Sequence, residues 1–506
     1  MMTKVKHILF VLLMGFGLVS GCKPKPKGAG ASYQVATIPV PDGLLAETGG
    51  LDFLSDGRLI ACFTRGEVMV YDPKTKEWSL FAKGLHEPLG LVVINDSEIV
   101  VLQRPELTRI TDTDKDGKAD VYEKITDDFG ISGNYHEFNY GPVRDSEGNF
   151  YIALNTASSG GGIRDNVRGE LRLNGRDGED GKRQMYSVVP YRGWVLKIQP
   201  DGKVIPFASG FRSPNGLGFD DSGNLFVTDN QSDWVETSTL YHVKKDRFFG
   251  HPASLVWQEE WKDADPFSLP ISTLDSLRTK ASVLFPHGII ANSPTQPLFI
   301  KNNEQFKDFE GQFLIGEMNR DRIFRVMLEE VSGEFQGACI PFVDGQGLSV
   351  GNNRLAFGPD GSLWVGQIEH GWRGDQGIQK ISSTGNPPMD IAKMSLTKNG
   401  FELTFTQAVN PEGALAIKNY QLRRYYYAYQ KKPFDEPVDK STQRDLQFVA
   451  IKDITISADH MRVELVLEAL KPGYVYELKL DSIFNQAGKP LDNQLIAYTL
   501  NNLLPS

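Results

Sequence analysis

A strand–turn–strand unit recurs through most of this 506-residue chain, and no other feature constrains the fold as strongly. Each copy has a small or polar start, an apolar run, a tight turn containing Gly, and a second apolar run. Such turns favour antiparallel hairpins, and a unit repeated along a chain predicts an array. We therefore predict an all-β fold of radially arranged hairpins, a β-propeller. The clearest copies are residues 49–60, 216–227 and 353–365, with looser ones at 90–101 and 140–153.

The repeats occupy residues 33–386 and divide into six blade-sized parts, which predicts a six-bladed propeller. Residues 35–40 form an apolar strand without a blade of its own. We expect this strand to be the outer strand of the last blade, where it closes the ring and covers an open edge. An insertion at 158–184 is rich in Gly, Arg and Asp, and it predicts a long surface loop.

The pattern changes after Pro387 and Pro388. Apolar and polar residues then alternate cleanly, which predicts strands with one buried face. We expect residues 389–502 to form an immunoglobulin-like or fibronectin-like β-sandwich. Residues 420–429 contain two arginines and several tyrosines, and they fit either a docking strand or a half-buried edge.

The first residues predict export. Lys4, Lys6 and His7 precede an apolar run at 8–19, which is too short to span a bilayer. The run ends in Val-Ser-Gly-Cys, which resembles the bacterial lipobox, so we expect residues 1–22 to be a lipoprotein signal with lipidation at Cys22. Residues 23–32 would be a tether. The expected location is a membrane anchored by lipid and facing the periplasm, the outer membrane being favoured over the inner. With 64 acidic against 54 basic residues and no basic stripe, nucleic acid is not an expected partner.

Residues 112–123 match the calcium-loop pattern. Acidic residues stand at positions one, three, five, nine and twelve of this segment, and the required Gly is at position six. The flanking segments look like strands, so we predict a structural Ca²⁺ clip rather than a calcium sensor. The predicted ligands are Asp112, Asp114, Asp116, Lys118 through its backbone, Asp120 and Glu123.

Polar residues recur where first strands start and second strands end. In a propeller these positions face one mouth of the central channel, so they predict a site for a polyhydroxylated or anionic ligand, such as a small carbohydrate. The first-strand starts supply Asn134, His136, Glu137, Arg212, Asn215, His287, Asn292 and Arg354. The second-strand ends supply Gln103, Arg104, Asn155, Asp229, Asn230, Glu317, Asn319, Gln367, Glu369 and His370.

Three of these segments resemble soluble quinoprotein sugar dehydrogenases. Residues 210–219 resemble the arginine-containing blade of that family, residues 136–152 its catalytic-histidine blade, and residues 353–365 its last blade. Nearly the whole chain after the lipobox also resembles uncharacterised proteins of environmental bacteria that are named as membrane-bound dehydrogenases.

The resemblance implies a pyrroloquinoline quinone (PQQ) cofactor over the channel mouth. His136 would take a proton from a sugar hydroxyl while hydride passes to the quinone, and Arg212 would stabilise the oxyanion. Arg354, Asn215, Asn230 and Gln367 would hold the cofactor. The chain departs from the family at Ser213, where asparagine is usual, and it has no haem-binding motif. A separate cytochrome c would then accept the electrons.

Two alternatives remain open. A metal-dependent, lactonase-like enzyme would hold Ca²⁺ in the channel through Glu317, Asn230 and Asp229. A glycan-binding lipoprotein would use the same mouth without catalysis, with the sandwich as a second contact. Lactone hydrolysis that needs Ca²⁺ but no quinone distinguishes the first alternative, and glycan retention without turnover distinguishes the second.

Overall fold

The computed structural model describes residues 31–505 except 178–183, 232, 370–373 and 432–441. The expected signal, Cys22, most of the tether and His370 therefore lie outside the described residues. Strands dominate, as predicted for an all-β chain. Within the described part of the chain, no helix is both long and apolar enough to cross a membrane.

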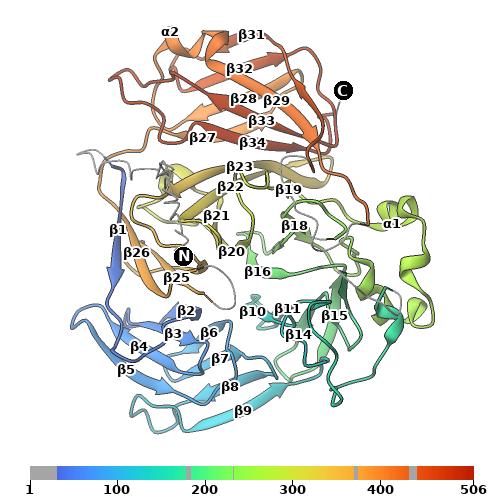
Figure 1. Ribbon diagram of the computed structural model, residues 1–506. Coiled ribbons are helices and arrows are strands. Elements are labelled where there is room, and N and C mark those ends of the chain that lie inside the picture. The colour runs from blue at the N-terminus through green and yellow to red at the C-terminus, as the bar shows by residue number, and fades with distance from the viewer. Residues whose placement is uncertain (1–30, 178–183, 232, 370–373, 432–441, 506) are drawn as a thin grey trace, which may run out of the picture.

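Six antiparallel four-stranded units are arranged around a common centre in the described residues (Figure 1). They form a β-propeller, and we number these sheets one to six in chain order. The first sheet contains β2 (Thr48–Phe53), β3 (Leu59–Phe63), β4 (Val68–Asp72) and β5 (Glu77–Ala82), and the second contains β6 (Leu91–Asn95), β7 (Glu98–Leu102), β8 (Leu107–Thr111) and β9 (Val121–Thr126). The third sheet contains β10 (Asn139–Arg144), β11 (Phe150–Leu154), β14 (Trp194–Ile198) and β15 (Val204–Ser209), and the fourth contains β16 (Pro214–Phe219), β17 (Leu225–Asp229), β18 (Thr239–Val243) and β19 (Val283–Leu284). The fifth sheet contains β20 (Pro294–Phe299), β21 (Phe313–Glu317), β22 (Arg322–Val331) and β23 (Glu334–Asp344), and the sixth contains β24 (Asn352–Phe357), β25 (Leu363–Gln367), β26 (Gly377–Ser383) and β1 (Tyr33–Ile38).

Glycine at the start of the repeats allows the first strands to meet at the centre. A Cβ on Gly90 would lie 1.7 Å from the carbonyl oxygen of Gly141, and one on Gly216 would lie 2.3 Å from the Cα of Gln296. Only glycine fits such close backbone approach. The first strands contact one another in the cyclic order β2, β6, β10, β16, β20, β24 and back to β2.

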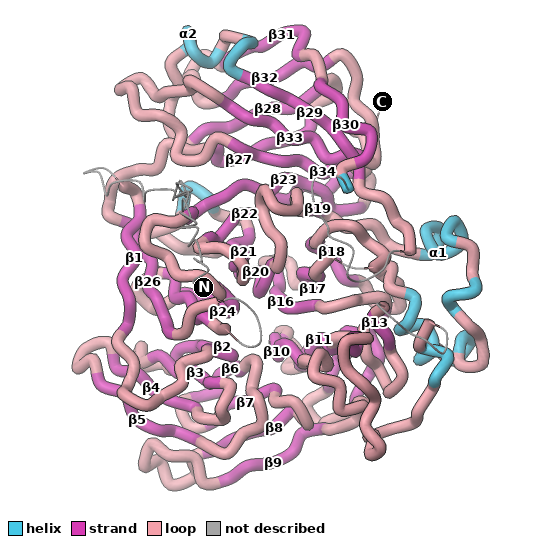
Figure 2. The backbone as a smooth tube through the Cα atoms, viewed as in Figure 1, coloured by secondary structure: helices cyan, strands magenta, loops and turns pink. Residues whose placement is uncertain are grey.

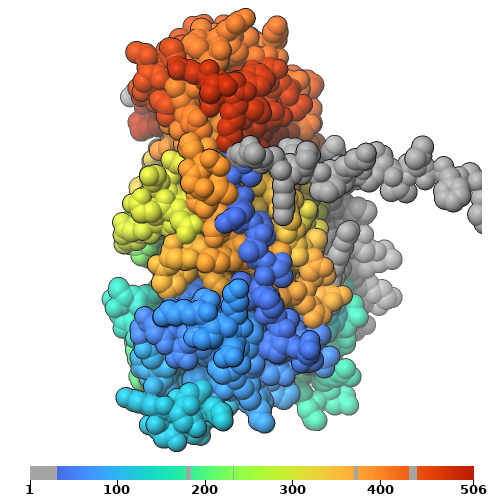
Figure 3. Space-filling view, turned by 90° about the vertical axis from the view of Figure 1, so that its left-hand side faces the viewer, coloured from blue at the N-terminus to red at the C-terminus, as the bar shows by residue number. Residues whose placement is uncertain are grey.

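The N-terminal strand closes the ring, as predicted. β1 pairs antiparallel with β26 from Tyr33 opposite Ser383 to Ile38 opposite Ile378. Figure 3 shows this strand, in blue, running beside the orange sixth sheet. The outer edge of the last sheet is therefore covered by the first strand of the chain.

The C-terminal residues form two sheets packed face to face. One contains β27 (Ile391–Leu396), β28 (Gly400–Phe405), β32 (Arg462–Leu467) and β31 (Ile451–Ile456); the other contains β34 (Leu495–Leu500), β33 (Tyr474–Leu480), β29 (Tyr420–Tyr426) and β30 (Arg444–Phe448). The short helix α2 (Pro411–Ala414) and the 3₁₀ turn η6 (Ile417–Asn419) precede β29.

The second of these sheets continues the fifth sheet of the ring. β34 pairs with β23, with Ala338 opposite Tyr498. Met327 and Ile340 from the ring belong to the same apolar core as Phe401 and Tyr476. The sequence predicts a separate module after Pro388, whereas the structure joins the two parts through one eight-stranded sheet.

Two long excursions leave the ring on one side. The first lies between β12 (Ala157–Ser158) and β13 (Met185–Tyr186), which pair with each other, and it includes η1 (Leu173–Gly175). The second, between β18 and β19, contains η2 (Pro252–Trp257), η3 (Glu259–Trp261), η4 (Pro266–Ser268) and α1 (Ile271–Leu277). Figure 2 shows the helical turns of this side in cyan. A further turn, η5 (Lys307–Phe309), lies between β20 and β21.

The predicted insertion at 158–184 is anchored in its described part. Asn174 donates to the carbonyls of Lys262 and Ala264, and Arg172 stacks on the Trp257 ring at 4.7 Å. The two excursions therefore support each other, and the described part of the insertion is a loop anchored by contacts to the second excursion.

Candidate functional site

Connectivity gives the ring two distinct faces. The chain enters each first strand and leaves each second strand at one face, which we call the mouth. The Asp-Gly and Ser-Gly turns between first and second strands lie at the opposite face, which we call the turn face. Residues at repeated positions of different sheets meet at one of these faces because the hairpins all run in the same sense.

His136 lies at the mouth, in the segment between β9 and β10, and is 8% exposed. Its Nδ1–H donates to the Thr156 carbonyl at 2.8 Å, and its backbone N–H donates to Asn134 Oδ1 at 3.0 Å. Burial lowers the pKa of His136 to about 3, and the charges of Arg212 and Arg104 act in the same direction. The neutral ring carries its proton on Nδ1, so Nε2 presents a lone pair. Nε2 has no hydrogen-bond partner among the described residues.

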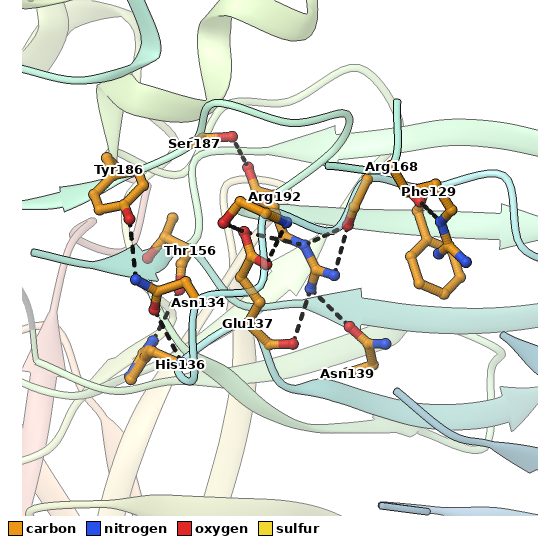
Figure 4. Close-up of polar contacts among 12 residues, drawn as sticks. Phe129, Asn134, His136, Glu137, Asn139, Thr156, Arg168, Tyr186, Ser187 and Arg192 are labelled. Atoms are coloured by element: carbon orange, nitrogen blue, oxygen red, sulfur yellow. Dashed lines mark hydrogen bonds and ion pairs between the residues drawn. The ribbon is translucent and has the colours of Figure 1, made fainter. Parts of the chain in front are cut away.

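A buried network fixes the segment that carries His136 (Figure 4). The Arg192 guanidinium donates to the carbonyls of Gly130 and Glu137 and to Asn139 Oδ1. The Glu137 carboxylate accepts from the backbone N–H and the hydroxyl of Ser132 at 2.8 and 2.7 Å. Both charged side chains are fully buried, so this network is a rigid support rather than a ligand site.

Asn134 connects that support to the first excursion. Its Nδ2 donates to the Ser158 carbonyl at 2.8 Å and to the Tyr186 hydroxyl at 3.0 Å. Its Oδ1 accepts from the backbone of both His136 and Ser158. The sequence places Asn134 among the ligand-facing residues, but its hydrogen-bonding capacity is used to hold the histidine segment.

Arg212 is next to His136 through a shared residue. The Thr156 carbonyl accepts from His136, while Thr156 N–H and Oγ1 donate to the Arg212 carbonyl at 3.1 and 2.7 Å. Burial lowers the pKa of Arg212, and the carboxylates of Asp233 and Asp229 oppose that shift. The structure thus brings together the two residues predicted to be catalytic.

The acidic groups at second-strand ends have a repeated structural role. Asp229 accepts from the backbone N–H groups of Arg212 and Ser213 at 2.9 and 2.6 Å. Glu317 accepts in the same way from Asn292 and Ser293 at 3.0 and 2.7 Å. Burial raises the pKa of Asp229 to about 6 and also raises that of Glu317. Part of the polar ring therefore exists to satisfy backbone donors where the chain enters a first strand.

The side chains of Arg354 and Gln367 are buried in hydrogen-bond networks within the ring and are not exposed at the mouth. Arg354 donates to the Leu89 carbonyl, to the carbonyl and Oδ1 of Asn215, and to the carbonyl and Oδ1 of Asn353. Its guanidinium lies 5.0 Å from the Tyr140 ring, and burial lowers its pKa to about 10. Gln367 donates to Asn352 Oδ1 and Gln379 Oε1.

These contacts bear on the implied quinone. PQQ carries several carboxylates and needs hydrogen-bond donors or cations around them. Arg354 and Gln367 already direct their donors to protein oxygens, and Asn215 donates to the Met318 sulfur. Arg354, Asn215 and Gln367, which the resemblance assigns to the cofactor, therefore do not fit it in this arrangement. His136 and Arg212 lie close together at the mouth.

Three buried oxygens at the mouth have no hydrogen-bond partner in the part of the chain that the structure describes: Asn155 Oδ1, Asn230 Oδ1 and Glu317 Oε2. They come from the second-strand ends of the third, fourth and fifth sheets. Asn155 Nδ2 donates to Ser213 Oγ at 2.8 Å, and Asn230 Nδ2 donates to Ser293 Oγ at 3.1 Å. Both amides thus direct their NH₂ groups to serines and leave their oxygens without a hydrogen bond. Oxygen ligands of this kind suit a cation such as Ca²⁺.

A histidine–aspartate pair beside Arg212 escapes sequence reasoning. His251 Nε2 lies 3.0 Å from Asp233 Oδ1, and Asp233 Oδ2 accepts from Met185 N–H at 2.9 Å. Both side chains are buried. His251 stands in the second excursion, and nothing in its sequence spacing connects it to Asp233.

The calcium-loop residues lie far from His136, between β8 and β9 on the turn face. Carboxylate oxygens of Asp112, Asp114 and Asp116 lie within 4.8 Å of one another. Asp120 accepts from Thr113, Lys118 donates its backbone N–H to Asp116, and Glu123 pairs with Arg109 at 3.0 Å. The predicted strand flanks are present. The first three ligands are grouped, whereas Glu123 points to Arg109.

Comparison with known proteins places the chain in a family. Residues 70–370, more than half of the chain, match the family described as domain of unknown function DUF7133, and the chain belongs to it. No curated protein matches the sequence.

Solved structures similar to the chain include PQQ-dependent enzymes. PQQ-bound aldose sugar dehydrogenase from Streptomyces coelicolor is 16% identical, with a TM-score of 0.48 over 70% of this chain and 99% of that one. The PQQ domain of pyranose dehydrogenase from Coprinopsis cinerea is 10% identical, with a TM-score of 0.47 over 71% and 98%. A Trichoderma reesei carbohydrate-active enzyme of family AA12 is 12% identical, with a TM-score of 0.47 over 70% and 97%. The activity of this chain has to be argued from its own site.

Proposed function

We propose that this protein is an enzyme acting on a hydroxyl group of a sugar or polyol at the mouth. His136 removes the hydroxyl proton and Arg212 stabilises the negative charge that develops. One observation carries the proposal: the buried His136 ring donates from Nδ1 to Thr156, leaving Nε2 without a partner among the described residues and beside the Arg212 segment. A backbone acceptor on one ring nitrogen fixes the tautomer that makes the other a base.

The favoured reaction class is sugar or polyol oxidation. Proton removal from the alcohol is the part that this chain's own residues support. Hydride removal needs an acceptor, a role that PQQ fills when bound in quinoprotein dehydrogenases. Because Arg354 and Gln367 are engaged internally, PQQ would need other partners here. Two molecules of a separate cytochrome c would then take the electrons from that hydride acceptor, one electron each.

The test is dye reduction by the purified protein with aldoses and polyols, with and without added PQQ and Ca²⁺. We expect His136→Ala to lower the rate about 10²-fold or more. His460→Ala, at a position in the C-terminal part, serves as the matched histidine control and should retain full activity. Equal rates in His136→Ala and the wild type would remove His136 from catalysis.

A second candidate is cation-assisted hydrolysis of a sugar lactone. The unsatisfied oxygens of Asn155, Asn230 and Glu317 favour it, because they suit Ca²⁺ better than an anionic cofactor. Asp229, expected from the sequence to be a ligand, is engaged with two backbone N–H groups. Asn155 is the added metal ligand: the sequence places it in the polar ring at the mouth but not among the Ca²⁺ ligands.

Lactone hydrolysis with Ca²⁺ and no quinone tests this candidate. Chelation should abolish hydrolysis, and Glu317→Gln should weaken Ca²⁺ binding by about tenfold while Glu310→Gln, on an exposed turn, leaves it unchanged. Hydrolysis that survives chelation excludes the metal-assisted route. Turnover of neither substrate class, with retention of glycans, would instead favour a purely binding protein.

We further propose that the ring is a six-bladed propeller and that the C-terminal sheets are immunoglobulin-like. The chain is proposed to be an exported lipoprotein anchored through Cys22, facing the periplasm, preferentially at the outer membrane. Fatty-acid labelling that is lost in Cys22→Ser tests the anchor. A wild-type protein without label would exclude it.

A further inference from the structure

A cavity of about 510 Å³ opens on the turn face, opposite His136. It lies at the seam between the first and sixth sheets, where the start and the end of the ring meet. Three turns build its walls, at residues 56–58, 72–74 and 359–360. Its volume is within the range of small-molecule sites.

The cavity has an aromatic floor. The Phe53 and Trp364 rings meet edge to face with their centroids 5.6 Å apart. Pro73 and Pro359 add apolar surface from the two sides of the seam. Phe53 is only half-buried, so part of its ring is accessible from the cavity. Such a floor suits a ligand with one flat apolar face.

The rim is charged but balanced. Asp56 pairs with Arg58 at 2.7 Å, and Asp360 pairs with Lys380 at 2.6 Å. Asp72 and Lys74 add one further charge of each sign. Three acids and three bases leave no net charge, so the rim favours neither an anion nor a cation. It offers hydrogen-bond acceptors and donors side by side, which matches neighbouring hydroxyl groups.

We propose that this cavity is a second, non-catalytic site for a neutral pyranose sugar, as a monosaccharide or one end of a disaccharide. The ring of the sugar stacks on Phe53, and its hydroxyls bond to the charged rim. The inference does not depend on the reaction proposed for the mouth. Because the occupant contacts the first and sixth sheets together, it also stabilises the closed ring.

The repeat supplies a matched control. Phe53, Phe219 and Phe357 occupy the same repeat position, each opposite a leucine of the next strand. Phe219 meets the Tyr151 ring edge to face, away from the cavity. Phe53→Ala removes the floor, and Phe219→Ala makes the same chemical change elsewhere in the ring.

The experiment is saturation-transfer NMR and calorimetry with methyl pyranosides of glucose, galactose, mannose and xylose, and with cellobiose. We expect saturable binding of at least one probe and a rise in Tm. Phe53→Ala should weaken binding about tenfold, and Phe219→Ala less than twofold. Arg58→Gln, a surface change on the rim, gives a second test, with a loss of about threefold expected, should Phe53→Ala fold poorly. His136→Ala should leave this binding intact.

Three results would overturn the proposal. One is the absence of saturable binding across the panel. Another is binding lost in His136→Ala but kept in Phe53→Ala and Arg58→Gln, which would place the sugar at the mouth. The third is equal binding of sorbitol, which has the hydroxyls but no ring face to stack.

Discussion

At the scale of single residues, burial determines what His136 can do. Its ring is enclosed beside two arginines, and both effects disfavour the imidazolium. A histidine held neutral with one nitrogen bonded to a carbonyl presents a lone pair on the other nitrogen, and its low pKa makes that nitrogen a weak base. The sequence predicts that His136 and Arg212 act together. Thr156 links them, because its carbonyl accepts from His136 and its hydroxyl donates to the Arg212 carbonyl.

We predict that His136 stays neutral down to about pH 3. Its pKa in the unfolded chain is about 6.5, so between these values the unfolded state binds more protons. The contribution of His136 to the free energy of unfolding is therefore fully present above about pH 6.5 and is lost as the pH falls toward about 3. NMR titration of the ring and denaturation of His136→Gln check this. A ring that titrates near pH 6.5 would contradict the burial argument.

Arg354 is predicted to stabilise the ring rather than to bind a cofactor. Arg354→Lys keeps the charge but cannot reach Leu89, Asn215 and Asn353 together. We expect it to lower the free energy of unfolding by about 3 kcal/mol, measured by urea denaturation. Arg58→Lys, at an exposed ion pair, is the control and should change stability little. An unchanged stability with lost PQQ binding would reverse this assignment.

At the scale of elements, the β8–β9 connection shows that pairing between the flanking strands affects the predicted calcium loop. The sequence correctly identifies strands on both sides of the loop and groups Asp112, Asp114 and Asp116. It does not reveal that Arg109 on β8 pairs with Glu123 on β9. Cross-strand pairing follows from register, and register is set by the whole hairpin.

We predict that Ca²⁺ raises the Tm of the wild type and that Asp114→Asn removes most of this rise. Asp220→Asn is the control, because Asp220 accepts turn N–H groups in the fourth sheet in a similar way. Arg109→Gln should tighten Ca²⁺ binding, since it releases Glu123 to become the bidentate ligand. Differential scanning fluorimetry and calorimetry measure both. Equal rises in Tm for Asp114→Asn and the wild type would exclude this loop as the site.

At the scale of the whole molecule, the C-terminal sheets are part of the ring's support. Glu236 follows the fourth sheet's second strand and is fully buried. Its carboxylate accepts from Ala428 N–H, Gln430 Nε2 and Arg444 at 3.0, 2.7 and 2.9 Å. Residues 427–429, which follow β29, dock against the ring, as one interpretation of residues 420–429 predicted. β29 itself is an internal strand between β30 and β33. The C-terminal part thus holds the loop that also carries Asp233.

We predict that truncation after residue 388 gives an insoluble protein, because it exposes the β23 edge and the apolar side chains of Met327 and Ile340. Removal of residues 503–506 alone should be tolerated, since Leu503 and Leu504 are exposed. The intact chain should unfold in one calorimetric transition. Two separate transitions, or a soluble, folded truncated ring, would show that the parts are independent.

The sequence by itself determined the repeat, the all-β class, the closing strand and the pairing of His136 with Arg212 at one mouth. These follow from local periods and from symmetry, which place equivalent positions of each unit together. Only the tertiary structure decided which polar groups are engaged with other protein groups, as Arg354, Gln367 and Asp229 are in the interior and Glu123 is in a surface ion pair. It also decided that the C-terminal sheets extend the fifth sheet. Both outcomes depend on contacts between residues distant in sequence, where burial strongly favours the pairing of donors with acceptors.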